Sequence, residues 1–333
     1  MNILMCSVGR RCELLKRFRK TMGEHGKIVA TDNSPYAPAL WFADQQYLVP
    51  KITDADYISV LADICEKEKI DAIFTLIDPE IAVLAKHRSV FEQMGVKVFV
   101  PSFASAELCF DKYALHRHMK KHEIPMVRTY GALAEFLDDL QTGNIGFPVF
   151  VKPRTGSGSV GARKIDSLAA LQTAMTDDPM LIIQEYMDCD DLDADVYVDA
   201  VSGEVVSAFS KKKLSSTIGG ANKTVSFKDE KLFDLIVRIA DVMELYGPND
   251  MDFFYRDGQY YLSEINPRFG GAYLHAYDAG VDFIELVRKN VNHVANPPVV
   301  GDYEEDVVMM MYDSVVVKKR EELLNTEVFY HRQ

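Results

Sequence analysis

Short apolar runs alternate with amphipathic segments along the first hundred residues of the chain. The runs predict buried parallel strands, and the segments between them, with apolar positions three or four residues apart, predict helices. This alternation is typical of a doubly wound, Rossmann-like α/β domain, here over residues 1–104, with a ligand crevice at the carboxyl ends of its strands. The strands are expected at Ile3–Cys6, Ile28–Thr31, Ala72–Leu76 and Val96–Val100, and the helices at Cys12–Met22, Tyr57–Lys67 and Pro79–Gln93.

The pattern changes after residue 105. A helix is expected at Lys112–His122, and residues 147–188 predict a strand, a glycine-rich loop, a strand, a helix and a further strand. From residue 192 the pattern is mostly antiparallel. It predicts strands at Asp195–Ala200 and Val205–Ser210, a helix at Glu230–Leu245 and a hairpin over residues 251–265. We therefore expect two further domains, over residues 105–187 and 188–333.

Composition and charge narrow the class of protein. With 48% apolar and 26% charged residues among 333, the chain is typical of a soluble globular protein. A formal charge of −13 argues against sequence-independent nucleic-acid binding. No apolar stretch is long enough for a membrane span, and the N-terminus does not resemble a secretory signal. The cysteines fit reduced thiols in a cytoplasmic protein; they are Cys6, Cys12, Cys65, Cys109 and Cys189.

Polar residues gather in the loops that follow the predicted parallel strands. The first loop has a single glycine and two arginines instead of G-x-G-x-x-G, which argues against a dinucleotide site. Arg10 and Arg11 could instead bind an anionic substrate, or pack a helix on the sheet. The residues of these loops that we take as substrate candidates are Ser7, Arg10, Arg11, Asp78 and Glu80.

The most informative segment is Ser263-Glu264-Ile265-Asn266-Pro267-Arg268. Alternation along a strand puts Glu264 and Asn266 on one face, where two oxygen donors suit Mg²⁺ and the arginine suits a phosphate. The competing interpretation is a strand that ends in a polar turn. Asp252, on the preceding strand, is a third candidate metal ligand. It reaches the face of Glu264 if Arg256-Asp257-Gly258 forms a three-residue turn, which is our prediction, and not if the turn has two residues.

A glycine-rich loop follows the strand that carries Lys152. Residues Thr155, Gly156, Ser157, Gly158, Ser159 and Gly161 expose backbone N–H groups that can surround phosphate oxygens. The loop lacks the G-K-[ST] of a Walker motif and joins two strands, so we expect a flap over a nucleotide. The alternative is a surface hairpin with one exposed lysine.

Further residues could complete a nucleotide site. Gln184, Glu185, Tyr186 and Met187 end an apolar strand and could hold an adenine ring, and Asp191 in the acidic run that follows could bind a ribose. Two other residues are candidates for the substrate. Lys213 could approach the γ-phosphate or a substrate carboxylate, although a solvated basic turn at Lys211-Lys212-Lys213 is the simpler interpretation. His275 could face the site or pack within a helix.

In this order, these motifs resemble the ATP-grasp superfamily, over nearly the whole chain, and the N-terminal loops resemble single-copy proteins related to the carbamoyl-phosphate synthase large chain. The resemblance implies an ATP-grasp fold, α/β with an α+β C-terminal part. It implies that Lys112 and Lys152 bind the α- and β-phosphates of ATP, under the flap, and that Asp252, Glu264 and Asn266 bind one or two Mg²⁺ ions, or Mn²⁺. Arg268 would stabilise the transferred phosphoryl group. The family's ribose-binding glutamate is replaced here by Asp191, with Asp190 as a rival.

The hypothesis that follows is an ADP-forming ligase that joins a small-molecule carboxylate to an amine, or a thiol, through an acyl phosphate. Lys152 and Arg268 would be its catalytic residues. A small-molecule kinase on the same fold and a nucleotide-binding regulatory subunit are the alternatives. No nucleic-acid or membrane partner is expected, and a homodimer is left open.

Overall fold

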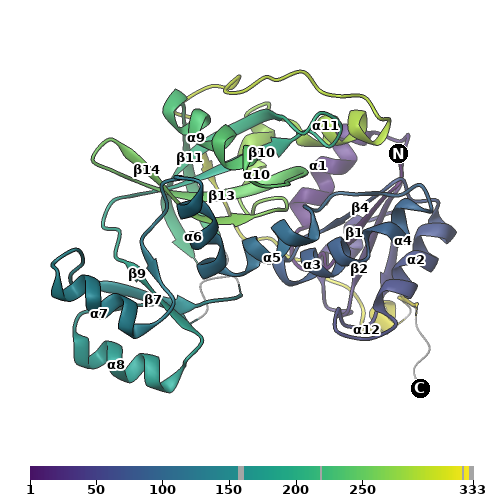
Figure 1. Ribbon diagram of the computed structural model, residues 1–333. Helices are drawn as coiled ribbons and strands as arrows, with labels where there is room; N and C mark the ends of the chain where they lie inside the picture. The colour runs from purple at the N-terminus through teal and green to yellow at the C-terminus, as the bar shows by residue number, and fades with distance from the viewer. Residues whose placement is uncertain (157–160, 218–219, 325, 330–333) are drawn as a thin grey trace.

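Three β-sheets organise the chain in this computed structural model (Figure 1). The structure describes residues 1–156, 161–217, 220–324 and 326–329. One sheet is formed largely by the first hundred residues, a second by the C-terminal half, and a smaller third sheet stands apart from the first (Figure 1). Helices α5 (Phe103–Phe110) and α6 (Lys112–Lys121) connect the first sheet to the other two.

The first sheet is parallel throughout, in the order β16-β3-β2-β1-β4-β5. Both of its faces are buried, because alternate residues of β1 enter two different apolar clusters: Ile3 and Met5 one, Leu4 and Cys6 the other. The predicted doubly wound domain is therefore confirmed. Its strands are β1 (Ile3–Cys6), β2 (Ile28–Asp32), β3 (Gln45–Leu48), β4 (Ala72–Thr75), β5 (Lys97–Val98) and β16 (Glu327–Val328), and its helices are α1 (Cys12–Met22), η1 (Pro38–Phe42), α2 (Tyr57–Glu68), α3 (Asp78–Lys86) and α4 (Arg88–Glu92).

Several details of this domain differ from the prediction. Strand β3 was not predicted, because it begins with two glutamines and only Tyr47 and Leu48 are buried. The single helix expected at Pro79–Gln93 is two helices that meet at His87. There Arg88 turns back to the sheet edge, and its guanidinium donates to the carbonyl oxygens of Val98 and Pro101, each at 3.0 Å.

The second sheet is antiparallel, in the order β14-β13-β10-β11-β12-β15. One face packs on α6 and on α9, and their apolar residues form one cluster with Leu192, Ala194 and Val196 of β10. The intervening aspartates of β10 point to the other face, as the period of two requires. The elements are β10 (Asp190–Val198), β11 (Val205–Thr217), β12 (Gly220–Phe227), α9 (Glu230–Asp241), β13 (Gly247–Arg256), β14 (Gln259–Asn266), α10 (Tyr273–Asp278), α11 (Phe283–Val291) and β15 (Val308–Met310).

Two of these strands are longer than predicted. Strand β10 begins at Asp190, so the acidic run is part of the strand and not a turn before it. Strand β11 continues through Lys211, Lys212 and Lys213, so the solvated basic turn is wrong. Charged residues concealed both strands, because one face of each is polar and the apolar alternation is interrupted.

The third sheet, in the order β6-β9-β7-β8, is covered on one face by α7 and α8 (Figure 1). It contains the strand–loop–strand–helix–strand arrangement that the sequence predicts for residues 147–188. Its elements are β6 (Thr129–Tyr130), α7 (Leu133–Gln141), β7 (Val149–Pro153), β8 (Arg163–Ile165), α8 (Leu168–Asp177) and β9 (Leu181–Glu185).

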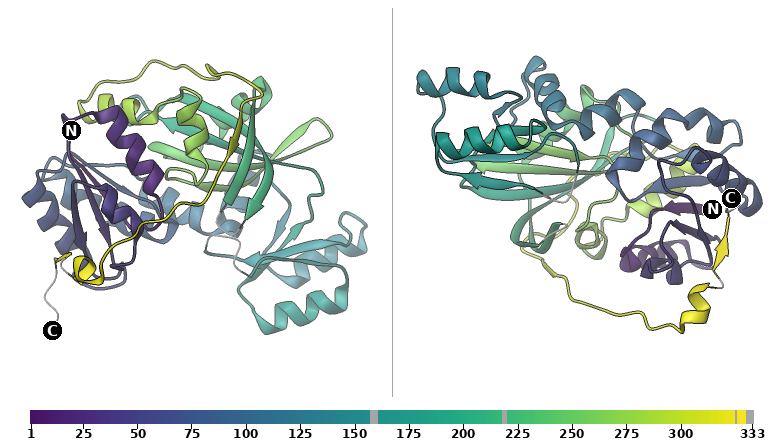
Figure 2. Two further views of the ribbon diagram at one scale, coloured as in Figure 1. Left: turned by 180° about the vertical axis from the view of Figure 1, so that it is seen from behind. Right: turned by 90° about the horizontal axis from the view of Figure 1, so that it is seen from below.

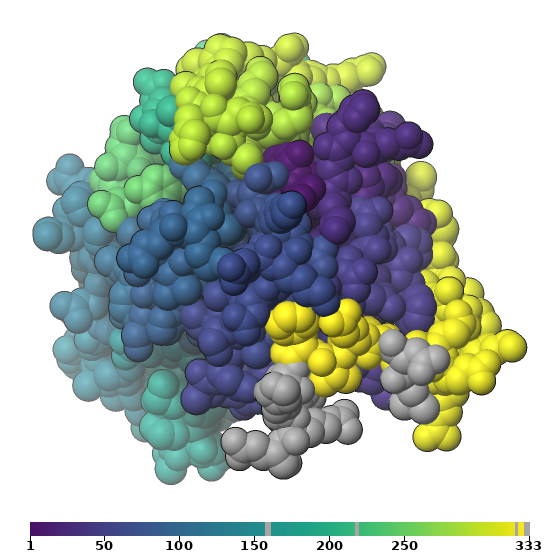
Figure 3. All heavy atoms as spheres, turned by 90° about the vertical axis from the view of Figure 1, so that its right-hand side faces the viewer, coloured from purple at the N-terminus to yellow at the C-terminus, as the bar shows by residue number. Residues whose placement is uncertain are grey.

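The C-terminal segment connects the two larger sheets. After β15 it runs in an extended path to α12 (Arg320–Leu324) and then to β16, which pairs with β3 (Figure 2). In Figure 3 this segment lies against the surface of the N-terminal domain. Within the described residues, no helix is both long and apolar enough to cross a membrane.

Candidate active site

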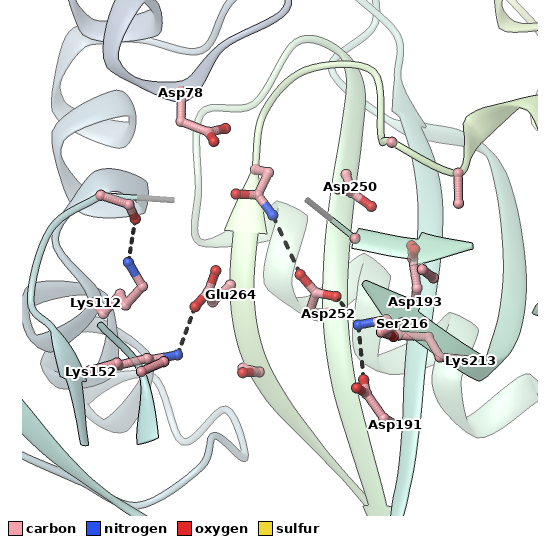
Figure 4. Close-up of a pocket in the computed structure, with 18 of the residues that line it drawn as sticks. Asp78, Lys112, Lys152, Asp191, Asp193, Lys213, Ser216, Asp250, Asp252 and Glu264 are labelled. Carbon is pink, nitrogen blue, oxygen red and sulfur yellow. Dashed lines mark hydrogen bonds and ion pairs between the residues drawn. The ribbon is translucent and has the colours of Figure 1, made fainter. Parts of the chain in front are cut away.

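A cleft of about 700 Å³ lies between the polar face of the second sheet and strand β7 of the third. Residues of the first domain close one end of it (Figure 4). The cleft brings together predicted residues from every part of the chain. Among those that line it are Arg11, Asp78, Lys112, Lys152, Thr155, Gly156, Asp191, Lys213, Asp252, Glu264, Asn266 and Arg268.

The β13–β14 hairpin decides which side chains face the cleft. Arg256 pairs with Gln259, so the turn has two residues, Asp257 and Gly258, both with positive φ; the predicted three-residue turn is wrong. That turn pairs Phe253 with Leu262 and would place Asp252 opposite Ser263. A register shift follows instead, and Asp252 pairs with Glu264. The extra residue, Ser263, is a β-bulge that brings both carboxylates to the cleft.

Lysines stand opposite these carboxylates on the third sheet and α6. The Nζ of Lys152 lies 2.6 Å from Oε1 of Glu264, and the Nζ of Lys112 donates to the carbonyl oxygen of Gly156 at 2.5 Å (Figure 4). Burial opposes the charge of Glu264, but the coulombic effect of Lys152 and Lys112 keeps its pKa below the ordinary value. Both lysines are buried, so their charges act in a medium of low polarity.

Lys213 reaches Asp252 from strand β11. Its ammonium forms ion pairs with Asp252 and, at 2.8 Å, with Oδ1 of Asp191. Asp252 also accepts from Nδ2 of Asn266 at 3.4 Å. Burial raises the pKa of Asp252 to about 6, against the opposing effect of Lys213. Asp191 lines the cleft, whereas its rival Asp190 is exposed and pairs with Lys212 at 2.6 Å.

Arg268 lines the cleft where the first domain meets it. Its Nε lies 2.9 Å from Oδ1 of Asp78, and its Nη1 lies 3.0 Å from Oδ2 of Asp250. Burial opposes the charge of Arg268, but these two carboxylates raise its pKa above the ordinary value. Arg11 donates to the carbonyl oxygens of Phe269 and Gly270, at 2.6 Å to the latter. Thus Arg11 ties the domains together and also faces the cleft.

The sequence analysis missed a buried acidic group beneath Arg268. Asp193, Asp195 and Asp250 offer oxygens within 4.8 Å of one another, and the fully buried Lys211 ion-pairs with Asp193 at 3.1 Å and with Asp195. Burial raises the pKa of both Asp195 and Asp250. Phe150 and Phe254, which line the cleft, were also missed. The aspartate–apolar alternation over Asp191–Val196 was the available signal for the acidic group.

The side chains of three residues predicted to hold adenine contact other residues. Gln184 donates to Oγ1 of Thr129 at 2.8 Å, Glu185 pairs with Arg256 at 2.7 Å, and the ring of Tyr186 lies under Lys164. Gln184 to Met187 are not among the described residues that line the cleft. Of the predicted flap, Thr155 and Gly156 line the cleft and Gly161 is exposed; Ser157, Gly158 and Ser159 lie outside the described residues.

Four candidate substrate residues, Ser7, Arg10, Glu80 and His275, are not among the described residues lining the cleft. Glu80 is fully buried and accepts from Ser7 at 2.7 Å, Thr75 at 2.6 Å and Tyr57. Arg10 is exposed. His275 is buried, contacts Oγ1 of Thr224 at 2.8 Å and packs edge-on against Phe209. For His275 the structure agrees with the packing alternative, and for Glu80 it shows burial that the sequence does not reveal.

The donor set fits the ion and nucleotide that the sequence predicts. Two carboxylates and an amide oxygen share one side of the cleft, which suits the hard ion Mg²⁺. Three buried or half-buried ammonium groups, from Lys112, Lys152 and Lys213, lie within the same cleft and match a polyphosphate in charge.

Comparisons with known proteins agree with this geometry. The family description "PylC-like, N-terminal domain" matches residues 3–99, and "ATP-grasp domain" matches residues 109–272. The chain is 24% identical over 263 residues to a formate-dependent phosphoribosylglycinamide formyltransferase of Janthinobacterium sp., covering 73% of this chain and 62% of that protein. It is 24% identical over 246 residues to the carbamoyl phosphate synthase large chain of Thermoplasma acidophilum, covering 68% of this chain and 23% of that protein.

The structure is similar to the crystal structure of N5-carboxyaminoimidazole synthetase from Staphylococcus aureus. The TM-score is 0.74 at 17% sequence identity, covering 93% of this chain and 81% of that one. At this identity the similarity concerns the fold. It includes the N-terminal sheet as well as the ATP-grasp domain, since it covers nearly the whole chain. The chain has the ATP-grasp fold with a PylC-like N-terminal domain, and it belongs to the ATP-grasp superfamily.

Proposed function

We propose that the protein is an ADP-forming ligase that activates a small-molecule carboxylate with ATP and joins it to an amine or a thiol. The observation that carries this proposal is the composition of the cleft. Lys112 and Lys152 on one side of the cleft face the carboxylates of Glu264 and Asp252 on the other (Figure 4). The amide of Asn266 and the guanidinium of Arg268 line the same cleft. The names of the relatives support the choice of reaction, because one uses formate, a carboxylate, and another makes carbamoyl phosphate.

In this proposal each residue acts by position and charge. Lys112 and Lys152 bind phosphate oxygens of ATP, and Asp191 binds the ribose. Asp252, Glu264 and Asn266 would hold one or two Mg²⁺ ions, which supply charge neutralisation for the phosphates. Arg268 neutralises the charge that develops on the phosphoryl group as it moves to the substrate carboxylate.

The acceptor would enter at the inner end of the cleft. Arg11, Asp78 and Arg268 meet there, and Asp78 begins helix α3 of the N-terminal domain. An acyl phosphate formed at this end lies away from the exposed mouth, which limits its hydrolysis. The amine then attacks the acyl carbon and phosphate leaves, so the residues need only position the two substrates.

An isotope experiment separates a ligase from a kinase. Purified protein is screened with MgATP, candidate carboxylates and amines for ADP release, and an active carboxylate is then supplied with ¹⁸O. We expect labelled inorganic phosphate, because one carboxylate oxygen leaves with the phosphoryl group, and a hydroxamate when hydroxylamine replaces the amine. A stable phosphorylated product with no free phosphate would identify a kinase instead.

A further inference from the structure

The charges of the cleft neutralise one another across the site. Lys152, proposed to bind phosphate, pairs with Glu264, proposed to bind metal, and Lys213 pairs with Asp252 in the same way. Each lysine therefore occupies the position where a metal ion would neutralise the carboxylate. Conversely, each carboxylate occupies the position where a phosphate would neutralise the lysine.

Like Lys152, Lys213 is a largely enclosed internal cation. Its side chain is 13% exposed, and it contacts Asp252 and Asp191 together. The other oxygen of Asp252 accepts from Asn266, so both oxygens of this proposed metal ligand are occupied. Ion pairs at such burial are stronger than on the surface, because little water competes for the charges. A free divalent ion would have to displace Lys213 from Asp252 and leave its ammonium with Asp191 alone, whose side chain is 43% exposed.

Resting on the proposed function, we infer that Lys213 is an internal counter-ion that keeps the metal site closed until a nucleotide phosphate arrives to receive its ammonium. The metal and the nucleotide then bind as a coupled pair. Mg²⁺ takes the place of Lys213 at Asp252, and Lys213 turns to a phosphate oxygen. By thermodynamic reciprocity the nucleotide raises the affinity for metal by the same factor as the metal raises the affinity for nucleotide.

The neighbouring Lys212 provides a matched control. It lies next to Lys213 in β11, has an equally long cationic side chain, and pairs with Asp190 at 2.6 Å, where the two side chains are 42% and 47% exposed. Removal of Lys212 changes the net charge by the same amount as removal of Lys213. Of these two lysines, Lys213 contacts a proposed metal ligand and Lys212 pairs with Asp190, so any difference between the two variants reports on the contact with Asp252.

The test measures metal binding without turnover. Free Mn²⁺ is followed by electron paramagnetic resonance in protein without nucleotide, for wild type, Lys213→Met, Lys213→Gln and Lys212→Met. We expect both Lys213 variants to bind Mn²⁺ about tenfold more tightly than wild type, and Lys212→Met to match wild type. Addition of ADP should raise the Mn²⁺ affinity of wild type far more than that of the Lys213 variants. Circular dichroism confirms that each variant is folded.

The double variant Lys213→Met with Asp252→Asn locates the effect, since it should lose the gain in Mn²⁺ affinity. Equal Mn²⁺ affinity in wild type and the Lys213 variants, or a gain that persists in the double variant, would overturn the inference. Because no substrate is present, this result is independent of whether the protein proves to be a ligase. A kinase on this fold would give the same Mn²⁺ result and a different isotope result.

Discussion

Glu264 and Glu80 show how differently one side chain is used in two regions of this molecule. Both are largely removed from water. Glu264 faces Lys152 and Lys112, and despite its burial its pKa stays below the ordinary value. Glu80 faces the hydroxyl groups of Ser7, Thr75 and Tyr57. Burial raises its pKa, although those hydrogen bonds oppose the shift.

The two carboxylates differ in the groups that surround them, and this difference decides which of them suits our proposed metal site. In the cleft, ammonium groups keep Glu264 ionised, and in our proposal a metal ion takes their place. In the Glu80 cluster (Ser7, Tyr57, Thr75 and Glu80) neutral hydroxyl groups satisfy the carboxylate, and no cation is paired with it within the described residues. Glu264 is therefore paired with cations in the cleft, as our proposal requires, and Glu80 is part of the packing of the N-terminal domain.

The largest effect on stability is expected at Arg268. Its guanidinium joins the N-terminal domain, through Asp78, to the second sheet, through Asp250. Arg268→Met leaves both carboxylates buried without a cation, so we expect a loss of about 3–5 kcal/mol in the free energy of unfolding, together with loss of turnover. Urea unfolding and ADP release measure the two effects. The control is Arg256→Met, which removes a more exposed pair with Glu185 and should cost at most about 1 kcal/mol. Equal losses in both variants would contradict the assignment.

Glu264→Gln tests the exchangeable carboxylate directly. The substitution keeps the size of the side chain and removes one charge from the proposed metal ligands, so turnover should fall by about 10²–10³-fold. Asn266→Ala should also lower turnover. Circular dichroism and a thermal melt should show a folded protein, because neither side chain is part of an apolar cluster. Near-normal ADP release by Glu264→Gln would refute the metal assignment.

His275 offers a pH test in the packing below the sheet. Burial, followed by the repulsion of Lys211, lowers its pKa from 6.5 to about 4. The unfolded chain thus binds the proton more readily. The stabilisation is complete above pH 6.5 and is lost as the pH falls through about 4. We expect the free energy of unfolding to fall by up to about 3 kcal/mol over this window, and His275→Gln to flatten the dependence. Urea titrations at several pH values, compared between the two proteins, would show whether the slopes differ.

Glu80→Gln tests the structural carboxylate. A raised pKa means that Glu80 stabilises the protein fully below its ordinary pKa of 4.5, and that this contribution is lost as the pH rises through the raised value. The variant should differ from wild type by about 1–3 kcal/mol, with wild type becoming relatively less stable as the pH rises. Turnover per folded molecule should not change. A selective loss of turnover would place Glu80 with Glu264, and the contrast between the two regions would fail.

The smallest effect is expected at the hairpin turn. Gly258 has φ +80°, so Gly258→Ala should lower the free energy of unfolding by about 1 kcal/mol, which urea unfolding would measure. The positions of Asp252 and Glu264 should not change. The reason is that the bulge at Ser263, and not the turn, sets the register of Asp252 with Glu264. Loss of Mn²⁺ binding in the presence of ADP would show that the turn also matters for the site.

Much of the fold follows from alternation along the chain. The parallel strands β1, β2 and β4 of the first domain contain continuous apolar runs, and the helices between the strands have one apolar face. Strands with a charged face were harder to predict, as β10 and β11 show. The apolar positions of β14 contain the missed signal of the bulge: Tyr260 and Leu262 are buried, and the next buried apolar residue is Ile265. The change of parity requires an extra residue between them.

The sequence by itself determined the superfamily, the doubly wound N-terminal domain and the principal charged residues of the cleft. These depend on local periodicity and on residue types in a fixed order along the chain. The tertiary structure alone decided which charges meet. A register shift brought Asp252 beside Glu264, burial separated Glu80 and His275 from the cleft, and packing of three strands enclosed Lys211 and Lys213 among aspartates. Pairing between strands depends on register and burial over long sequence separations, and the periodicity of a single strand does not specify it.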